Sequence, residues 1–163
     1  MSGSLYAWYG PSDLESLAGR EVTLSGELEL GKLTRLSSLL HSAAGHVRAS
    51  LTFRQHRAGG VAVELVAQAT VELVCQRCLE AFQHELAERV DLALVAAGTL
   101  ASAVPVGFEP FELTDGRLQP AELVEDELIV AIPLVPKHAR IEDCGSLAAI
   151  QAGLHGRSET AGQ

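Results

Sequence analysis

Cysteine is scarce in this chain, with only three among 163 residues. Small secreted domains that depend on disulfides carry more cysteines, usually in even numbers, so a disulfide scaffold is excluded and a reducing compartment is favoured. The chain also lacks a run of eighteen apolar residues and a basic, apolar leader at its N-terminus. We therefore expect a cytoplasmic protein without a membrane partner.

Basic and aromatic residues are few as well. Lysine and arginine number 12 against 21 acidic residues, which gives a net charge of -9, and aromatic residues make up 4%. The average field repels phosphate, and few rings are available to stack on unpaired bases. A basic protein partner is thus electrostatically easier than a nucleic acid, unless cationic side chains gather on one face.

Motifs of hydrolases and of nucleotide-binding enzymes are missing. The chain has no GxSxG, no HExxH and no glycine-rich phosphate loop. The acidic segment "ELVEDEL" (122–128) is predicted to be a solvent-exposed helix face and not an acid/base pair. We expect a protein that is not an enzyme and has no small-molecule substrate.

The chain does have enough apolar residues, 47%, for a substantial core. Its length suits one domain, predicted over residues 1–155, and the polar residues 156–163 are predicted to form a disordered tail.

Alternation of apolar and polar residues predicts an antiparallel sheet. Residues 20–30 alternate, and residues 46–75 form a long hairpin that turns at Gly59 and Gly60. Residues 79–90, "LEAFQHELAERV", are rich in helix formers, yet their alternation continues through "VDLALV". We favour a strand that continues to about residue 95, because context often overrides propensity.

Short helices are predicted around this sheet. The most clearly marked begins at Pro120 and ends before Pro133, and another follows Pro11, with Ser12 and Asp13 as caps. Leucines at helical spacing predict a third within residues 32–43. A loop over 96–107, an edge strand in "FEPFEL" and a brief helix over 146–153 complete the prediction. The fold class expected is α+β, an antiparallel β-sheet with a long central hairpin packed by short helices.

Cys75 and Cys78 have the spacing that lets two sulfurs bind one metal ion. A tetrahedral structural zinc ion needs two more ligands, and His138 and Cys144 are the natural candidates, with His84 as an alternative. Arg77 could offset the charge of three thiolates. A metal-free interpretation also stays open, in which Cys75 is a core residue of its strand and Cys78 packs in a turn.

The same CxxC motif allows a thiol-dependent oxidoreductase as the alternative function. Such a site lies after a strand and at a helix N-terminus, where the first thiol becomes acidic. The alternating strands and helices of a thioredoxin-like fold are not predicted here, so this alternative is disfavoured.

The polar face of the hairpin carries a cationic stripe that includes Arg48, Arg54 and Arg57. In one interpretation, arginines of this stripe pair with Glu64 or Glu72 across the hairpin. In the other, Arg48, Arg54 and Arg57 bind RNA phosphates.

Two segments together resemble a known family. They are "VELVCQRCLEAF" (71–82) and "ELVEDELIVAIPLVPKH" (122–138), the latter followed by "EDCG" (142–145). The pairing resembles the bacterial large ribosomal RNA subunit accumulation protein family, the YceD family. With the "FEPFEL" and "DGRL" pieces, the resemblance extends over roughly half the chain.

The resemblance implies a cytoplasmic, non-enzymatic factor for large-subunit ribosomal RNA synthesis or accumulation and ribosome biogenesis. Its partners would be a ribosomal protein, ribosomal RNA or a preribosomal particle. It also implies that the segment after CxxC is extended. Many relatives carry further cysteines near the second segment, whereas this chain keeps Cys144, with His138 upstream.

Overall fold

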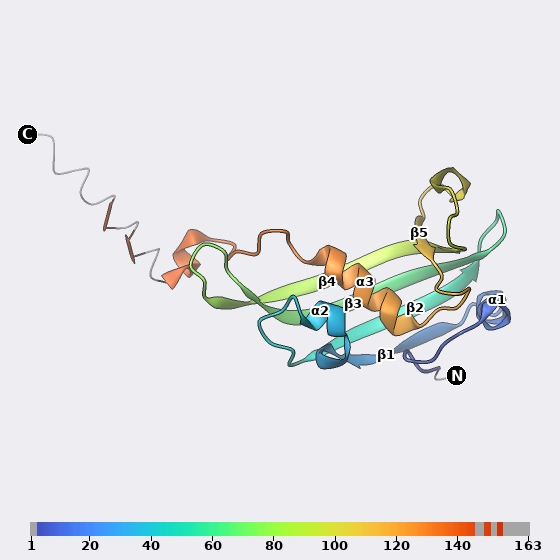
Figure 1. Ribbon diagram of the computed structural model, residues 1–163, viewed down its shortest axis with the longest axis horizontal. Coiled ribbons are helices and arrows are strands. Elements are labelled where there is room, and N and C mark those ends of the chain that lie inside the picture. The colour runs from blue at the N-terminus through green and yellow to red at the C-terminus, as the bar shows by residue number, and fades with distance from the viewer. Residues whose placement is uncertain (1–2, 146–148, 151–152, 155–163) are drawn as a thin grey trace, which may run out of the picture.

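The structure is a computed structural model that describes residues 3–145, 149–150 and 153–154. It is an elongated α+β fold, in which α2 and α3 lie across one face of a five-stranded sheet and α1 lies near one end (Figure 1). The helices are α1 (Pro11–Gly19), α2 (Thr34–Ser37) and α3 (Pro120–Ala131). The strands are β1 (Thr23–Glu29), β2 (His46–Gln55), β3 (Val61–Val74), β4 (Ala81–Val95) and β5 (Glu109–Glu112).

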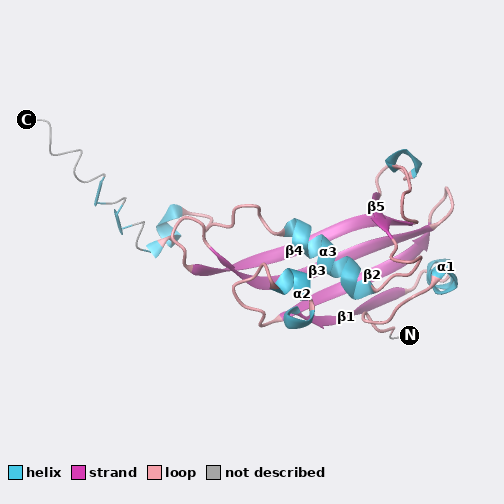
Figure 2. Ribbon diagram, in the orientation of Figure 1, coloured by secondary structure: helices cyan, strands magenta, loops and turns pink. Residues whose placement is uncertain are grey.

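The strands lie in the sheet in chain order, β1-β2-β3-β4-β5. Neighbours from β1 to β4 are antiparallel, but β5 runs parallel to β4. The expected antiparallel sheet is therefore correct for four strands and wrong for the fifth. The reason is the connection, because residues 96–108 loop out from the end of β4 and come back beside Leu92, so that β5 runs in the same direction as the last residues of β4 (Figure 2).

Burial follows the alternation of the sequence. Odd-numbered residues of β2 and β3 face the helices, and Leu51, Phe53, Val63 and Leu65 are completely buried. The even-numbered residues lie on the opposite face of the sheet, which no helix of the described residues covers (Figure 2). Since a pleated strand points successive side chains to opposite faces, this pattern directly produces one apolar and one polar face.

The segment after the two cysteines is a strand, as favoured from its alternation. β4 pairs with β3 from Val74 opposite Ala81 to Ala62 opposite Ala93, the longest ladder in the sheet. A helix here would have left the polar backbone groups of one edge of β3 without the partners that β4 provides. Tertiary pairing thus overrides the helix propensity of this segment.

The helices confirm most of the sequence prediction but correct details. Helix α1 begins at Pro11 with Gly10 at its N-cap, so Ser12 and Asp13 are not caps; Asp13 instead accepts the Gly10 N–H at 3.0 Å. Helix α2 has only one turn, because Ser37 and Ser38 hydrogen-bond back to its carbonyls.

Helix α3 occupies Pro120–Ala131 as predicted, and Leu123, Val124 and Leu128 are buried. The expectation that its acidic segment is a solvated face is wrong for Glu125, which is only 6% exposed. This carboxylate accepts hydrogen bonds from α2, so it can be buried without leaving its charge unpaired.

The remaining predictions divide between confirmed and untested. β5 is an edge strand that contains Pro110, and Thr114 to Arg117 form the expected turn. The predicted tail at 156–163 and most of the predicted helix at 146–153 fall outside the described residues, so the domain boundary at residue 155 stays a prediction. None of the helices in the described part of the chain is long and apolar enough to cross a membrane.

Candidate functional site

Three cysteines and one histidine meet at one end of the sheet. The ligand atoms of Cys75, Cys78, His138 and Cys144 all lie within 4.8 Å of one another. The first two come from the turn between β3 and β4, and the other two come from the chain after α3 (Figure 1). These are the four ligands expected from the sequence, and we refer to them as the Cys/His cluster. His84, the alternative ligand, is not among them.

The β3–β4 turn is built to point both of its sulfurs the same way. The N–H of Cys75 donates to the carbonyl of Glu80 at 2.9 Å, and the N–H of Leu79 donates to the carbonyl of Cys75 at 2.8 Å. Leu79 closes the turn in the left-handed conformation, with φ of 63°. A non-glycine residue rarely adopts this conformation, and here it allows the chain to reverse directly after Cys78.

The chain after α3 is attached to this turn by polar and ring contacts. The N–H of Gln76 donates to the carbonyl of Pro136 at 2.8 Å, and the guanidinium of Arg77 donates to the carbonyl of His138. The His138 ring also lies against Phe82, with 4.8 Å between ring centroids. These contacts place His138 beside Cys78, although the two are far apart in sequence.

The distances within the Cys/His cluster are close to van der Waals contact or shorter. The sulfurs of Cys75 and Cys144 are 3.8 Å apart, so they are not joined as a disulfide. Nδ1 of His138 lies 3.6 Å from the Cys78 sulfur and 3.4 Å from the Cys144 sulfur. Cys75 and Cys144 are completely buried.

The two buried thiols have opposite electrostatic environments. Burial by itself would raise the pKa of Cys75, but hydrogen bonds from the backbones of Cys78, His138 and Arg77 outweigh it and lower this pKa to about 5. Burial and the neighbouring thiols raise the pKa of Cys144 to about 11. The thiolate of Cys75 is therefore favoured, whereas the thiolate of Cys144 is opposed.

Arg77 lies beside these sulfurs. Its Nε is buried and has no hydrogen-bond partner among the described residues, and its charge favours the thiolate of Cys144. A guanidinium is costly to bury unless negative charge lies nearby. The position of Arg77 fits a cluster that carries negative charge.

The structure separates the three arginines of the predicted RNA face. Arg54 and Arg57 line one cavity at the tip of the β2–β3 hairpin. Arg48 lies six residues earlier in β2, roughly 20 Å away along the strand, and faces Glu27 and Gln68 in the neighbouring strands. The predicted pairing across the hairpin is present for Arg54, which contacts Glu64 at 3.3 Å. Binding of RNA by these arginines stays a prediction.

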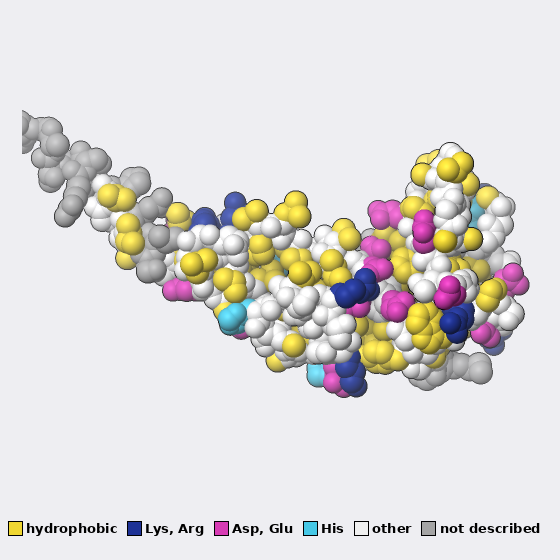
Figure 3. Space-filling view, viewed as in Figure 1, with side chains coloured by type: hydrophobic (Ala, Val, Ile, Leu, Met, Phe, Trp, Pro, Cys, Tyr) yellow, Lys and Arg dark blue, Asp and Glu magenta, His cyan; other side chains and the backbone are white. Residues whose placement is uncertain are grey.

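An acidic surface that the sequence reasoning missed lies over α3 and the β5 edge (Figure 3). Burial raises the pKa of Glu127, and the charges of Glu109, Asp126 and Glu88 raise it further. We call these four residues the acidic surface. They come from β4, β5 and α3, so only Asp126 and Glu127 are neighbours in sequence, and no spacing rule could have joined them.

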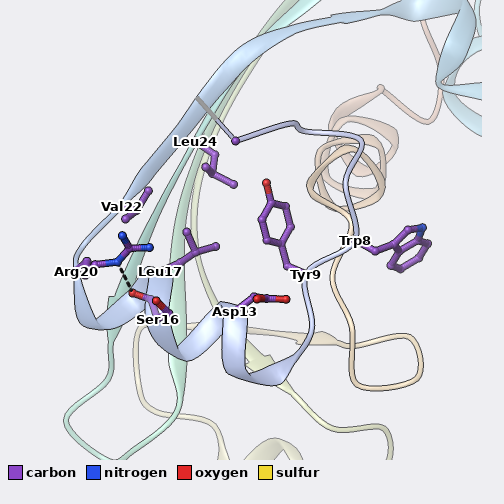
Figure 4. A pocket seen from close by; sticks show the side chains of 9 residues that line it. Trp8, Tyr9, Asp13, Ser16, Leu17, Arg20, Val22 and Leu24 are labelled. Atoms are coloured by element: carbon purple, nitrogen blue, oxygen red, sulfur yellow. Dashed lines mark hydrogen bonds between the residues drawn. The ribbon is translucent and has the colours of Figure 1, made fainter. Parts of the chain in front are cut away.

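A further cavity, of about 550 Å³, opens beside α1. Tyr9, Leu17, Val22 and Leu24 provide an apolar lining, while the Trp8 ring points away from them (Figure 4). Arg117 lies over the Trp8 ring, at 5.4 Å from the centroid. This cavity shares no residue with the Cys/His cluster.

Comparison with known proteins identifies a family and a curated relative. A family profile described as "Large ribosomal RNA subunit accumulation protein YceD" matches residues 63–161. A protein of Haemophilus influenzae with the same description is 31% identical over 123 residues, which cover 75% of this chain and 71% of the relative. No solved structure matches.

Proposed function

Because the chain belongs to the YceD family of large ribosomal RNA subunit accumulation proteins, we propose that it supports accumulation of large-subunit ribosomal RNA and ribosome biogenesis. It acts in the cytoplasm as a non-enzymatic factor that binds a ribosomal protein or the RNA of a preribosomal particle. The family match carries this proposal, since its residues 63–161 include all four members of the Cys/His cluster.

A basic ribosomal protein is the partner that the charges favour for docking. The net charge of -9 attracts basic proteins at a distance, and the acidic surface concentrates charge where α3 meets the sheet edge. The mutual repulsion that raises the pKa of Glu127 would be relieved by a cationic partner. Such complementarity mainly increases the rate and specificity of association.

The Cys/His cluster is proposed to hold one structural zinc ion. With zinc–sulfur bonds of about 2.3 Å, zinc–nitrogen bonds of about 2.0–2.1 Å and tetrahedral angles, two sulfurs would be about 3.8 Å apart, and sulfur and nitrogen about 3.6 Å apart. The sulfurs of Cys75 and Cys144 are 3.8 Å apart. Nδ1 of His138 lies 3.6 Å from the sulfur of Cys78 and 3.4 Å from the sulfur of Cys144. The donor set and these three separations therefore fit zinc.

Zinc bound there would stabilise thiolates and join the β3–β4 turn to the chain after α3, with no catalytic step. Arg77 would offset the net negative charge of a site with three thiolates. Four protein ligands leave no open coordination position, which supports a structural role.

A thiol oxidoreductase is less well supported. The residues after Cys78 form a strand, so the CxxC motif lacks the helix N-terminus that activates such thiols. In addition, the sulfur of Cys75 contacts that of Cys144, whereas a redox-active CxxC motif would pair it with Cys78. These two observations favour the structural interpretation.

The proposed function is tested by depleting the protein and measuring the ratio of large-subunit to small-subunit ribosomal RNA. We expect the ratio to fall and the wild-type chain to restore it. A Glu109→Lys/Glu127→Lys chain should restore it less and should co-purify with less ribosomal protein. The matched control is Glu27→Lys/Glu85→Lys, on the uncovered face, which should behave as wild type. An unchanged ratio on depletion would refute the proposal.

The zinc site is tested by elemental analysis of protein purified under reducing conditions without chelator. We expect one zinc per chain, and its loss together with reduced stability in Cys75→Ser/Cys78→Ser. A variant that stays equally stable but loses disulfide-exchange activity would support the oxidoreductase instead.

A further inference from the structure

A polar cavity of about 320 Å³ lies on the uncovered face of the sheet, where β2 turns into β3. Arg54, His56 and Arg57 line it from the hairpin, Asp91 from β4, and Phe108 from the loop before β5. β3 begins at this end and reaches the Cys/His cluster at its other end (Figure 1). The cavity and the cluster are thus separate features.

The charged groups of this cavity differ in how fully they are paired. The carboxylate of Glu64 is shared by Arg54 at 3.3 Å and Arg89 at 2.8 Å. In the described part of the chain, neither Asp91 nor Arg57 has an ion-pair partner within 4.0 Å. The cavity therefore offers one free carboxylate and one free guanidinium, and its surroundings carry three guanidiniums against two carboxylates.

Two rings complete the cavity. Phe108 meets His56 edge to face, with 4.9 Å between centroids and 89° between planes. Nδ1 of His56 accepts the N–H of Ala58 at 2.9 Å, so in the neutral ring Nε2 carries the proton and can donate it to a ligand. A flat ligand can use the face of one of these rings, as unpaired bases do on protein aromatics.

A carboxylate, a guanidinium and an aromatic face together match one base better than the others. A carboxylate can accept two parallel N–H groups, which guanine presents on its Watson–Crick edge and adenine, cytosine and uracil do not. An arginine can donate to the guanine carbonyl, and a second can bind the phosphate. We propose that this cavity binds an unpaired guanine ribonucleotide, with Asp91 on the base edge, Phe108 against the base and Arg57 on the phosphate.

The assignment of this guanine to single-stranded ribosomal RNA rests on the proposed function. A free guanine nucleotide shares the same chemistry. Because the chain is acidic overall, the contact should depend on base recognition more than on general attraction of phosphate, and its salt dependence should be shallow.

The test uses a fluorescent oligouridine RNA with one central guanosine and a matched RNA with adenosine in that position. By fluorescence anisotropy, we expect the full chain to bind the guanosine RNA roughly tenfold more tightly. Asp91→Asn and Phe108→Ala should each remove this preference, and Arg57→Ala should weaken both RNAs equally. Glu85→Gln, on the same strand and the same face but outside the cavity, is the matched control and should retain the preference.

Three results would overturn the inference. The wild-type chain could show no preference for the guanosine RNA, the cavity variants could bind both RNAs like the wild type, or Glu85→Gln could lose the preference as fully as Asp91→Asn does. Competition by GMP separates the sources. If GMP displaces the labelled RNA only weakly, RNA is supported as the ligand. If GMP displaces it as strongly as the unlabelled guanosine RNA does, RNA is overturned as the ligand and a free nucleotide is supported. Arg57 is an exposed turn residue, so its variant should fold normally and keep the test decisive.

The outcome is distinguishable from failure of the proposed function. If the cavity variants lose guanosine binding in vitro but restore the ribosomal RNA ratio in depleted cells, then the cavity binds guanine without serving RNA accumulation. If depletion itself leaves the ratio unchanged, then the proposed function fails whatever the cavity binds.

Discussion

Glu125 of α3 holds Arg35 of α2 by its backbone and by its side chain at once. One carboxylate oxygen accepts the Arg35 N–H at 2.7 Å, and the other accepts the guanidinium at 3.1 Å. The first oxygen also accepts the N–H of Leu36 at 3.0 Å. A residue far along the chain thereby satisfies the free N–H groups at the start of a one-turn helix that has no side-chain cap of its own.

Glu125→Ala is expected to destabilise the protein by about 2–3 kcal/mol, because it leaves buried N–H groups of α2 without a partner. Urea unfolding followed by circular dichroism measures the change. Asp126→Asn is the matched control, since Asp126 also pairs with Arg35 but is more exposed, and it should cost less than about 1 kcal/mol. Equal losses in the two variants would contradict this role of Glu125.

His138→Ala is expected to lower zinc content and zinc affinity, because it removes the nitrogen donor from the Cys/His cluster. The measurement is competition with a chromogenic chelator, alongside the melting temperature with and without zinc. His84→Ala should retain stoichiometric zinc, since His84 lies outside the cluster. Zinc loss in His84→Ala alone would reverse the ligand assignment.

Leu79→Gly is expected to stabilise the fold by up to about 1 kcal/mol. The left-handed conformation costs a non-glycine residue about 1–2 kcal/mol, and glycine recovers this less its own entropy on folding. Little packing is lost, because Leu79 is 73% exposed. Leu134→Gly, at another exposed leucine but without a positive φ, should not stabilise. Chemical denaturation of both variants measures their free energies of unfolding, and a loss of stability in Leu79→Gly would contradict the prediction.

Glu127→Gln is expected to raise the free energy of unfolding at neutral pH. Burial and the nearby acids raise the pKa of folded Glu127, so its stabilising contribution is present below the ordinary carboxyl pKa and is lost as pH rises through the folded value. The gain should be on the order of 0.5 kcal/mol at neutral pH and should vanish where the glutamate is protonated. Unfolding curves across this pH range measure it; a gain that grows on acidification would have the wrong sign.

The sheet could be predicted from the sequence because its signal is local. Alternation along residues 46–95 specifies which side chains are buried, and a pleated strand can bury only alternate residues. Phe82 and Leu86 continue this alternation, which is why a strand was favoured there despite the helix propensity of the neighbouring residues. The parallel β5 could not be predicted, since its direction depends on where a weakly patterned loop leads the chain.

The candidate site, too, could be predicted from the sequence only in part. Cys75 and Cys78 were identifiable from the sequence alone, because two thiols three residues apart can meet one ion whatever the rest of the fold does. The choice between His84 and His138 was open, since His84 is much nearer in sequence. Only the packing of the chain after α3, through Gln76 and Arg77, brings His138 to the sulfurs.

The sequence by itself thus determined the strands, α3 and the two cysteines of the turn, because each depends on residues a few positions apart. The tertiary structure decided what those local patterns leave open: the burial of Glu125, the cavity that joins Arg54 with Asp91 and Phe108, and the meeting of Cys75 with Cys144. Each of these depends on groups many residues apart, whose approach is set by how the strands and helices pack and not by any spacing along the chain.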